Sequence, residues 1–261
     1  MTPVITIAQL NEWFAAELTP YIWPFFRVLG VVMVAPVFGA RLVPVRVRIV
    51  LGVVLTAAIA PTIPTVVLFS TPIENAFLIA HEIVVGIAMG FVLQMIFDAL
   101  VIGGQTIAMS MGLGFAMMVD PQRGVSVPVL SQFFLILGIL VFLSLGGHLA
   151  LIQALADSFA TLPVGQISSV ANLAGVVDWG SQMFIGAVRI ALPAVAALLV
   201  ANIAFGVMSR AAPTLNLFAV GFPVALLLGF VVLLVNIGSL GTLVELLFGE
   251  ALLHVAAIVG G

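Results

Sequence analysis

The chain has 261 residues, of which 64% are hydrophobic and 7% are charged, and its mean hydropathy is +1.39. Soluble globular proteins carry about a quarter charged residues, so this composition excludes that class and indicates a membrane protein or a subunit of a membrane assembly. The formal net charge is −3, all seven cations are arginine, and the absence of cysteine excludes disulfides and thiolate chemistry.

Apolar runs predict about six helices and no strand. The N-terminus has no basic residue before Arg27, so it lacks the positive region of a cleavable signal peptide, and we expect the first apolar segment to remain in the mature protein. The expected fold is all-α, of the integral-membrane type, with a single domain over residues 1–261. The predicted segments lie near residues 21–38, 47–60, 76–103, 129–145, 183–207 and 217–237, and an apolar tail follows at 240–259.

Charged side chains interrupt several of these segments. Arg27 lies in the first, Glu82 and Asp98 in the third, and Arg189 in the fifth. Each costs about 2.5 to 3.5 kcal/mol in a membrane-spanning helix unless it is paired or hydrated. We therefore expect many helices to face protein instead of lipid, with these two cations and two carboxylates in buried pairs, within the chain or with neighbouring subunits. A role in an ion pathway is the alternative.

The loops divide by charge. The arginines outside the predicted helices fall in the first, third and fifth connections, whereas the opposite side carries only acidic residues, so the positive-inside rule places both termini outside the cytoplasm if all six segments cross. The longest stretch outside the apolar segments is residues 163–178. It is rich in Gly, Ser and Asn, which predicts an external loop. A short loop that binds a partner is the alternative.

Small residues mark two sites of close helix packing. Gly86 and Gly90 form a GxxxG pattern, and small residues recur at every fourth position from Gly104 through Ala108 to Ala116. Between and after these small residues the chain is rich in methionine, with one phenylalanine. Unbranched thioether side chains adapt to changing shapes, so the segment 104–121 predicts a deformable seal. Core packing beside a close helix crossing is the alternative.

The sequence offers no complete enzyme site. His81-Glu82 begins an HExxH-like string, but Val85 stands where the second zinc-binding histidine would be. Glu82 and Asp98 lie about 24 Å apart along one helix, so they cannot share a proton within it. No GxSxG nucleophile motif occurs. We expect no enzyme activity, metal or cofactor, and we interpret His81 and His148 as structural imidazoles instead of ligands or pH switches.

Several longer motifs, taken together and in order, resemble the FliR family of flagellar export proteins. They cover nearly the whole chain: WPFFRVL at 23–29, VPVRVR at 43–48, MGLGFAMMVDP at 111–121, GGHLALI at 146–152, DSF at 157–159 followed by LP at 162–163, and SRAAPTLNLFAVGFPVALLLG at 209–229.

The resemblance implies a non-enzymatic subunit of the flagellar type III export gate, in the bacterial inner membrane at the base of the basal body. It further implies helical hairpins that assemble with the flagellar proteins FliP, FliQ and FlhB into a closed helical ring, through which unfolded proteins are exported. No nucleic acid is expected as a partner. The pore plug implied by the family comprises Met111, Gly112, Gly114, Phe115, Met117, Met118, Asp120 and Pro121.

Two other functions remain open at the level of sequence. The equivalent subunit of a virulence type III secretion system, the injectisome, would share these motifs. A secondary transporter would bind its substrate at broken helices, for which Pro193, Asn202 and Pro223 mark candidate breaks.

Overall fold

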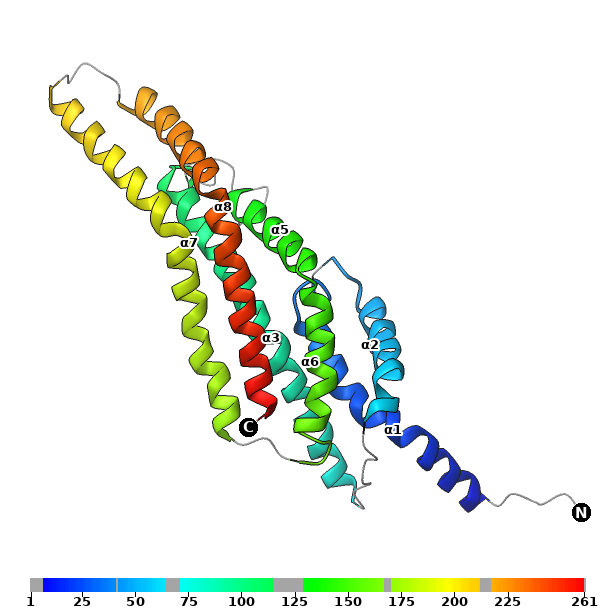
Figure 1. Ribbon diagram of the computed structural model, residues 1–261. Helices are drawn as coiled ribbons and strands as arrows, with labels where there is room; N and C mark the ends of the chain where they lie inside the picture. The colour runs from blue at the N-terminus through cyan, green and yellow to red at the C-terminus, as the bar shows by residue number, and fades with distance from the viewer. Residues whose placement is uncertain are drawn as a thin grey trace, which may run out of the picture. The chain divides into compact units, whose positions relative to one another are not determined.

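The computed structural model describes residues 7–40, 42–63, 71–114, 129–166, 170–211 and 217–260. These residues form helices joined by turns, and no strand occurs among them (Figure 1). The prediction of an all-α fold is confirmed. In chain order the elements are α1 (Ile7–Val34), α2 (Val45–Ile59), the short 3-10 helix η1 (Ala60–Thr62), α3 (Pro72–Ser110), α5 (Val129–Ser144), α6 (Gly147–Thr161), α7 (Val170–Ala211) and α8 (Leu217–Gly260).

Five of the described helical segments are long and apolar enough to cross a membrane, and α5 and α6 pass the same test when they are taken together as one broken span. Helices α3, α7 and α8 have 39, 42 and 44 residues. At 1.5 Å per residue they are about 58, 63 and 66 Å long, whereas about 20 residues cross the hydrocarbon core of a bilayer. Each of the three is therefore about twice as long as a single crossing requires.

Two sequence-based boundaries were wrong. The segment 217–237 and the apolar tail 240–259 form one continuous helix, α8, because the residues between them, Gly238 and Ser239, are tolerated inside an otherwise strongly apolar helix. The expected loop at 163–178 ends early, because α7 already begins at Val170. The first eight residues of α7 include three valines, an asparagine and a glycine, which are weak helix formers, so intrinsic propensity does not account for this early start.

Local chemistry explains several helix ends. Thr71 and Glu74 form a reciprocal capping box before α3, in which the Glu74 amide donates to Thr71 Oγ1 at 3.3 Å and the Thr71 amide donates to Glu74 Oε2 at 3.2 Å. Between α5 and α6, Gly146 has φ +69°, a left-handed conformation that favours glycine and ends α5. The turn before α2 is held by Arg48, whose guanidinium donates to the carbonyl of Ala40 at 2.7 Å.

The described contacts divide the chain into two compact units, and α3, α7 and α8 each contribute one segment to both. The first unit comprises residues 1–94, 148–179 and 251–261. In it, α1 and α3 approach closely at glycines. A Cβ atom on Gly90 would lie 2.9 Å from the Ala35 backbone nitrogen, and one on Gly30 would lie 2.7 Å from the Ile83 carbonyl oxygen.

The second unit comprises residues 95–147 and 180–250. Its core contains a cluster of three aromatic rings from α3, α5 and α8, namely Phe97, Phe142 and Phe248, with ring centroids 5.0 to 5.6 Å apart. Edge and tilted ring contacts at this spacing are favourable beyond the apolar area that they bury. The expectation of a single domain over residues 1–261 stays a prediction.

Candidate functional site

A fully buried ion pair joins two helices of the first unit. Arg27 on α1 donates from Nε to Glu82 Oε2 on α3 at 2.7 Å, and its Nη2 donates to Oε1 at 3.2 Å. Neither side chain is exposed to solvent. This bidentate geometry is the strongest form of a charge-assisted hydrogen bond. The structure thus brings together one cation and one carboxylate of the four expected to pair.

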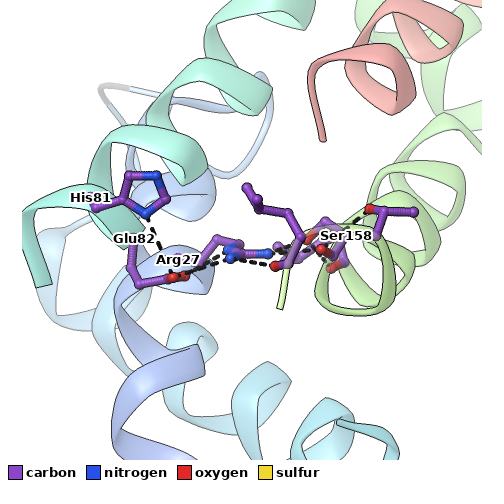
Figure 2. Close-up of polar contacts among 7 residues, drawn as sticks. Arg27, His81, Glu82 and Ser158 are labelled. Carbon is purple, nitrogen blue, oxygen red and sulfur yellow. Dashed lines mark hydrogen bonds and ion pairs between the residues drawn. The ribbon is translucent and has the colours of Figure 1, made fainter. Parts of the chain in front are cut away.

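Arg27 also caps the C-terminal end of α6 by hydrogen bonds (Figure 2). Its Nη1 donates to the Ser158 carbonyl oxygen at 3.0 Å and to Ser158 Oγ at 3.1 Å, and Nη2 donates to the Leu162 carbonyl oxygen at 2.9 Å. These carbonyls belong to the negative end of the α6 dipole, which favours a cation there. The guanidinium carbon lies 4.3 Å from the centroid of the Phe159 ring. With the two bonds to Glu82, all five N–H donors of Arg27 are used.

His81 lies beside this pair on α3 (Figure 2), with its Nδ1 3.8 Å from Glu82 Oε1. The expectation of a structural imidazole stays a prediction, as it does for His148. No group of three His, Asp or Glu side chains able to hold a metal ion occurs within the described residues.

Asp98 and Arg189 are placed differently from the first pair. Asp98 on α3 is half-buried, and Arg189 on α7 is exposed. Arg189 borders a small cavity of about 110 Å³ between α7 and α8, together with Pro193 and Asn236. Because proline has no N–H, Pro193 leaves the Arg189 carbonyl without its usual partner inside the helix.

The predicted close-packing residues lie where helices approach one another within each unit. In the first unit, Gly86 faces the backbone of Arg27, and an added Cβ would meet its carbonyl oxygen. In the second unit, a Cβ on Gly104 would lie 2.9 Å from the Ser131 Cα on α5. Ala108 is fully buried. Ala116 lies outside the described residues.

The described part of the predicted plug lies at the end of α3. Met111 is fully buried, and a Cβ on Gly229 of α8 would lie only 2.6 Å from its side chain. Gly112 has φ +83°, a backbone conformation that favours glycine, and Gly114 faces the side chain of Met109. Phe115, Met117, Met118, Asp120 and Pro121 lie outside the described residues.

One polar and aromatic contact in the first unit was not predicted from the sequence. Trp179 on α7 stacks on His254 near the end of α8, and His254 Nε2 lies 3.1 Å from the Gly175 carbonyl oxygen. Trp179 Nε1 donates to the Val92 carbonyl oxygen at 3.3 Å. No sequence pattern links these residues, because His254 on α8 is 79 positions from Gly175 on α7.

Comparison with known proteins connects this chain to one family. Residues 18–251 match the model of the family described as bacterial export proteins, family 1. The chain is 38% identical over 245 residues to the flagellar biosynthetic protein FliR of Escherichia coli strain K12, with 92% of each chain covered. It is 39% identical to FliR of Pectobacterium carotovorum, with 92% of this chain and 93% of that protein covered.

A more distant relative is FliR of Aquifex aeolicus, 34% identical over 215 residues, which cover 82% of this chain and 83% of that protein. The family match over residues 18–251 spans parts of both units, and Arg27 and Glu82 lie within it. The chain therefore belongs to the FliR family of bacterial export proteins and is a membrane component of flagellar protein export.

Proposed function

We propose that this chain is a non-enzymatic subunit of the flagellar type III export gate. It assembles with FliP, FliQ and FlhB in the bacterial inner membrane, at the base of the basal body, into a closed helical ring for unfolded substrates. Family membership supports the export role. All three relatives compared above carry a flagellar name, which favours the flagellar system over the injectisome.

Helix length supports assembly in a larger complex. Because α3, α7 and α8 are about twice as long as one membrane crossing, part of each helix needs contacts with protein or water. Large apolar side chains are exposed along the same helices, including Val200 on α7 and Val235 on α8, which are 69% and 78% exposed. Contiguous exposed apolar surface of this kind marks a contact with lipid or with another protein.

We further propose that the segment from Met111 to Pro121 closes the pore at rest. The observation that carries this proposal is the end of α3, where Met111 is anchored on Gly229 and the left-handed Gly112 follows at once. In this proposal Gly112 and Gly114 act as hinges when a substrate arrives. Met and Phe side chains make an apolar and weakly specific seal, which suits a pore that must pass varied chains but stop ions.

Ion leakage tests the plug. Replacing Phe115 and Met118 with Ala removes side-chain volume from the proposed seal, so we expect cells that express the complex to take up ions or small solutes that wild-type cells exclude. Met208→Ala is the matched control, because Met208 is 48% exposed on α7, outside the segment. Equal leakage in the wild type and the double variant would contradict the proposal that this segment closes the pore.

Subunit composition tests the assembly. We expect the chain extracted in detergent to co-purify with a P-type and a Q-type subunit, identified by the mass of the intact complex and of its components. A stable monomer that transports a small solute by itself would contradict the gate and would favour a secondary transporter.

A further inference from the structure

One exposed face of α7 carries a row of residues, here called the seam, that has the spacing of a helix-packing surface and contains one charge. Its residues are spaced alternately by four and three positions, which is the heptad pattern of two helices that pack along their length. All are exposed; Ile185 is 39% exposed, and Leu192, Leu199 and Ile203 are 58 to 60% exposed. The seam consists of Ile185, Arg189, Leu192, Ala196, Leu199 and Ile203.

This seam lies opposite the buried face of α7, although Arg189 borders the cavity against α8 and Leu192 borders a cavity against α3. The inner face of α7 contains Ala187, Ile190, Ala191, Ala194 and Leu198, all at most 4% exposed. The helix is thus apolar on two sides, and only one side is covered by this chain. A helix that is apolar all round is typical of a position inside an assembly or a membrane.

The charge of Arg189 favours a contact with protein over a contact with lipid tails at this face. Arg189 takes no part in the Arg27–Glu82 pair, and the polar α8 residues that line its cavity, Asn236 and Ser239, carry no charge. Lipid tails offer nothing to neutralise a guanidinium, and an isolated charge in an apolar contact is costly. The complementary partner surface is therefore an apolar helix with an acidic side chain at the level of Arg189.

The α8 residues that border the cavity with Arg189 run from Val232 to Leu243, before both glutamates of that helix, Glu245 and Glu250. Leu247 of α8 packs against α7 at Gly186, where an added Cβ would lie 3.4 Å from its side chain. Glu245 is two residues away from Leu247, about 200° around the helix. Glu245 is exposed and is directed away from the face of α8 that contacts α7.

We propose that the seam from Ile185 to Ile203 docks an apolar helix of another gate subunit, and that a single Asp or Glu on that helix pairs with Arg189. This inference rests on the proposed function, since it names the contact through which the chain joins its complex. The heptad residues give the interface its register and apolar area. The charge pair selects the partner, because a helix without the carboxylate leaves the guanidinium buried and unpaired.

Charge reversal tests the contact. In the co-expressed complex, Arg189→Glu places two carboxylates opposite each other, so we expect the co-purified partner subunits to fall at least about tenfold. Arg210→Glu is the matched control, since Arg210 is exposed in the last turn of the same helix, and it should leave the yield unchanged. Because Arg189 is exposed in this chain, the variant should unfold in detergent at the wild-type temperature.

Suppressors identify the partner residue. Selection for restored motility in the Arg189→Glu background should return changes of Asp or Glu to Lys or Arg in an apolar helix of another subunit. If the reversed charge lowers the unfolding temperature, the same selection with Arg189→Gln should return changes of that residue to a neutral one.

Three outcomes would overturn the inference. They are wild-type partner yields for Arg189→Glu, suppressors confined to this chain, such as changes at Glu245, and unchanged subunit yields with a loss of bound anionic phospholipid. The last result would assign Arg189 to a lipid headgroup. A wild-type chain that fails to co-purify with any gate subunit would instead refute the proposed function, so the two failures are distinguishable.

Discussion

The indole ring of Trp179 and the imidazole ring of His254 stack at 4.5 Å between centroids, with 15° between their planes. The pair ties the end of α8 to the first turns of α7. His254→Ala removes the ring, so it should lower the free energy of local unfolding at the end of α8 by about 0.5 to 1.5 kcal/mol. We expect faster amide hydrogen exchange over residues 251–260 than in the wild type.

His254→Phe is the control for this contact, because it keeps an aromatic ring over Trp179 but loses the polar contact to the Gly175 carbonyl. It should retain more protection than His254→Ala. Equal exchange in both variants and the wild type would show that the stack does not hold the end of α8.

The buried Arg27–Glu82 pair predicts non-additive mutations. Glu82→Leu leaves the guanidinium buried without its carboxylate, so we expect the free energy of unfolding to fall by about 3 to 5 kcal/mol. The double variant Arg27→Met with Glu82→Leu removes both charges and should be markedly more stable than Glu82→Leu. Thermal unfolding in detergent measures the difference.

The double variant still loses the bonds from Arg27 to the α6 carbonyls, so it should not reach wild-type stability. Additive losses from the two single variants would contradict the coupling, since residues in one ion pair are expected to interact.

The crossing of α1 and α3 depends on the missing side chain of Gly86. An alanine there would collide with the Arg27 carbonyl oxygen, which is backbone and cannot rotate away. We expect Gly86→Ala to destabilise the chain by about 1 to 3 kcal/mol, the usual cost of overpacking. The midpoint of thermal unfolding is the measurement.

Gly180→Ala on α7 is the matched control, because nothing lies within 4 Å of a Cβ at that position. Alanine inside a helix is favoured over glycine by about 0.5 to 1 kcal/mol, so this variant should be neutral or slightly more stable. A Gly86→Ala variant as stable as Gly180→Ala would contradict the close crossing.

The anchor of the proposed plug predicts a gain of leakage. Gly229→Ala would place a methyl group into the Met111 side chain and displace the end of α3. If the segment after Met111 closes the pore, this displacement should raise the uptake of small ions by cells that express the complex. Fluorescent reporters of internal ion concentration measure it.

Gly221→Ala on the same helix has open space around its added Cβ and should leave uptake at the wild-type level. Wild-type ion uptake in both variants would show that the contact between Met111 and Gly229 does not hold the pore closed.

Part of this molecule was predictable from its sequence. Long apolar runs without strand patterning predicted the all-α class, and the number of apolar segments agreed with the five or six candidate spans. The motif at 111–121 and the string at 209–229 predicted the family, which the match over residues 18–251 confirmed. These properties depend on composition and on the order of residues along the chain, and both are present before folding.

Helix continuity was less predictable. The stretch from residue 170 to Asp178 has the composition of a loop, yet it begins a helix of 42 residues. Propensity is a weak guide at such places, because packing against other helices decides the outcome.

Pairing was decided only by the tertiary structure. The sequence offered two cations and two carboxylates within apolar segments, and nothing in it distinguished Arg27 from Arg189. Folding brings Ser158 and Leu162, 131 and 135 residues away, against Arg27 and completes its hydrogen bonds. The same packing leaves Arg189 exposed beside the cavity between α7 and α8. Hydropathy measures the cost of a buried charge, but the partner that offsets this cost comes from helices distant in sequence, so its identity depends on their three-dimensional packing.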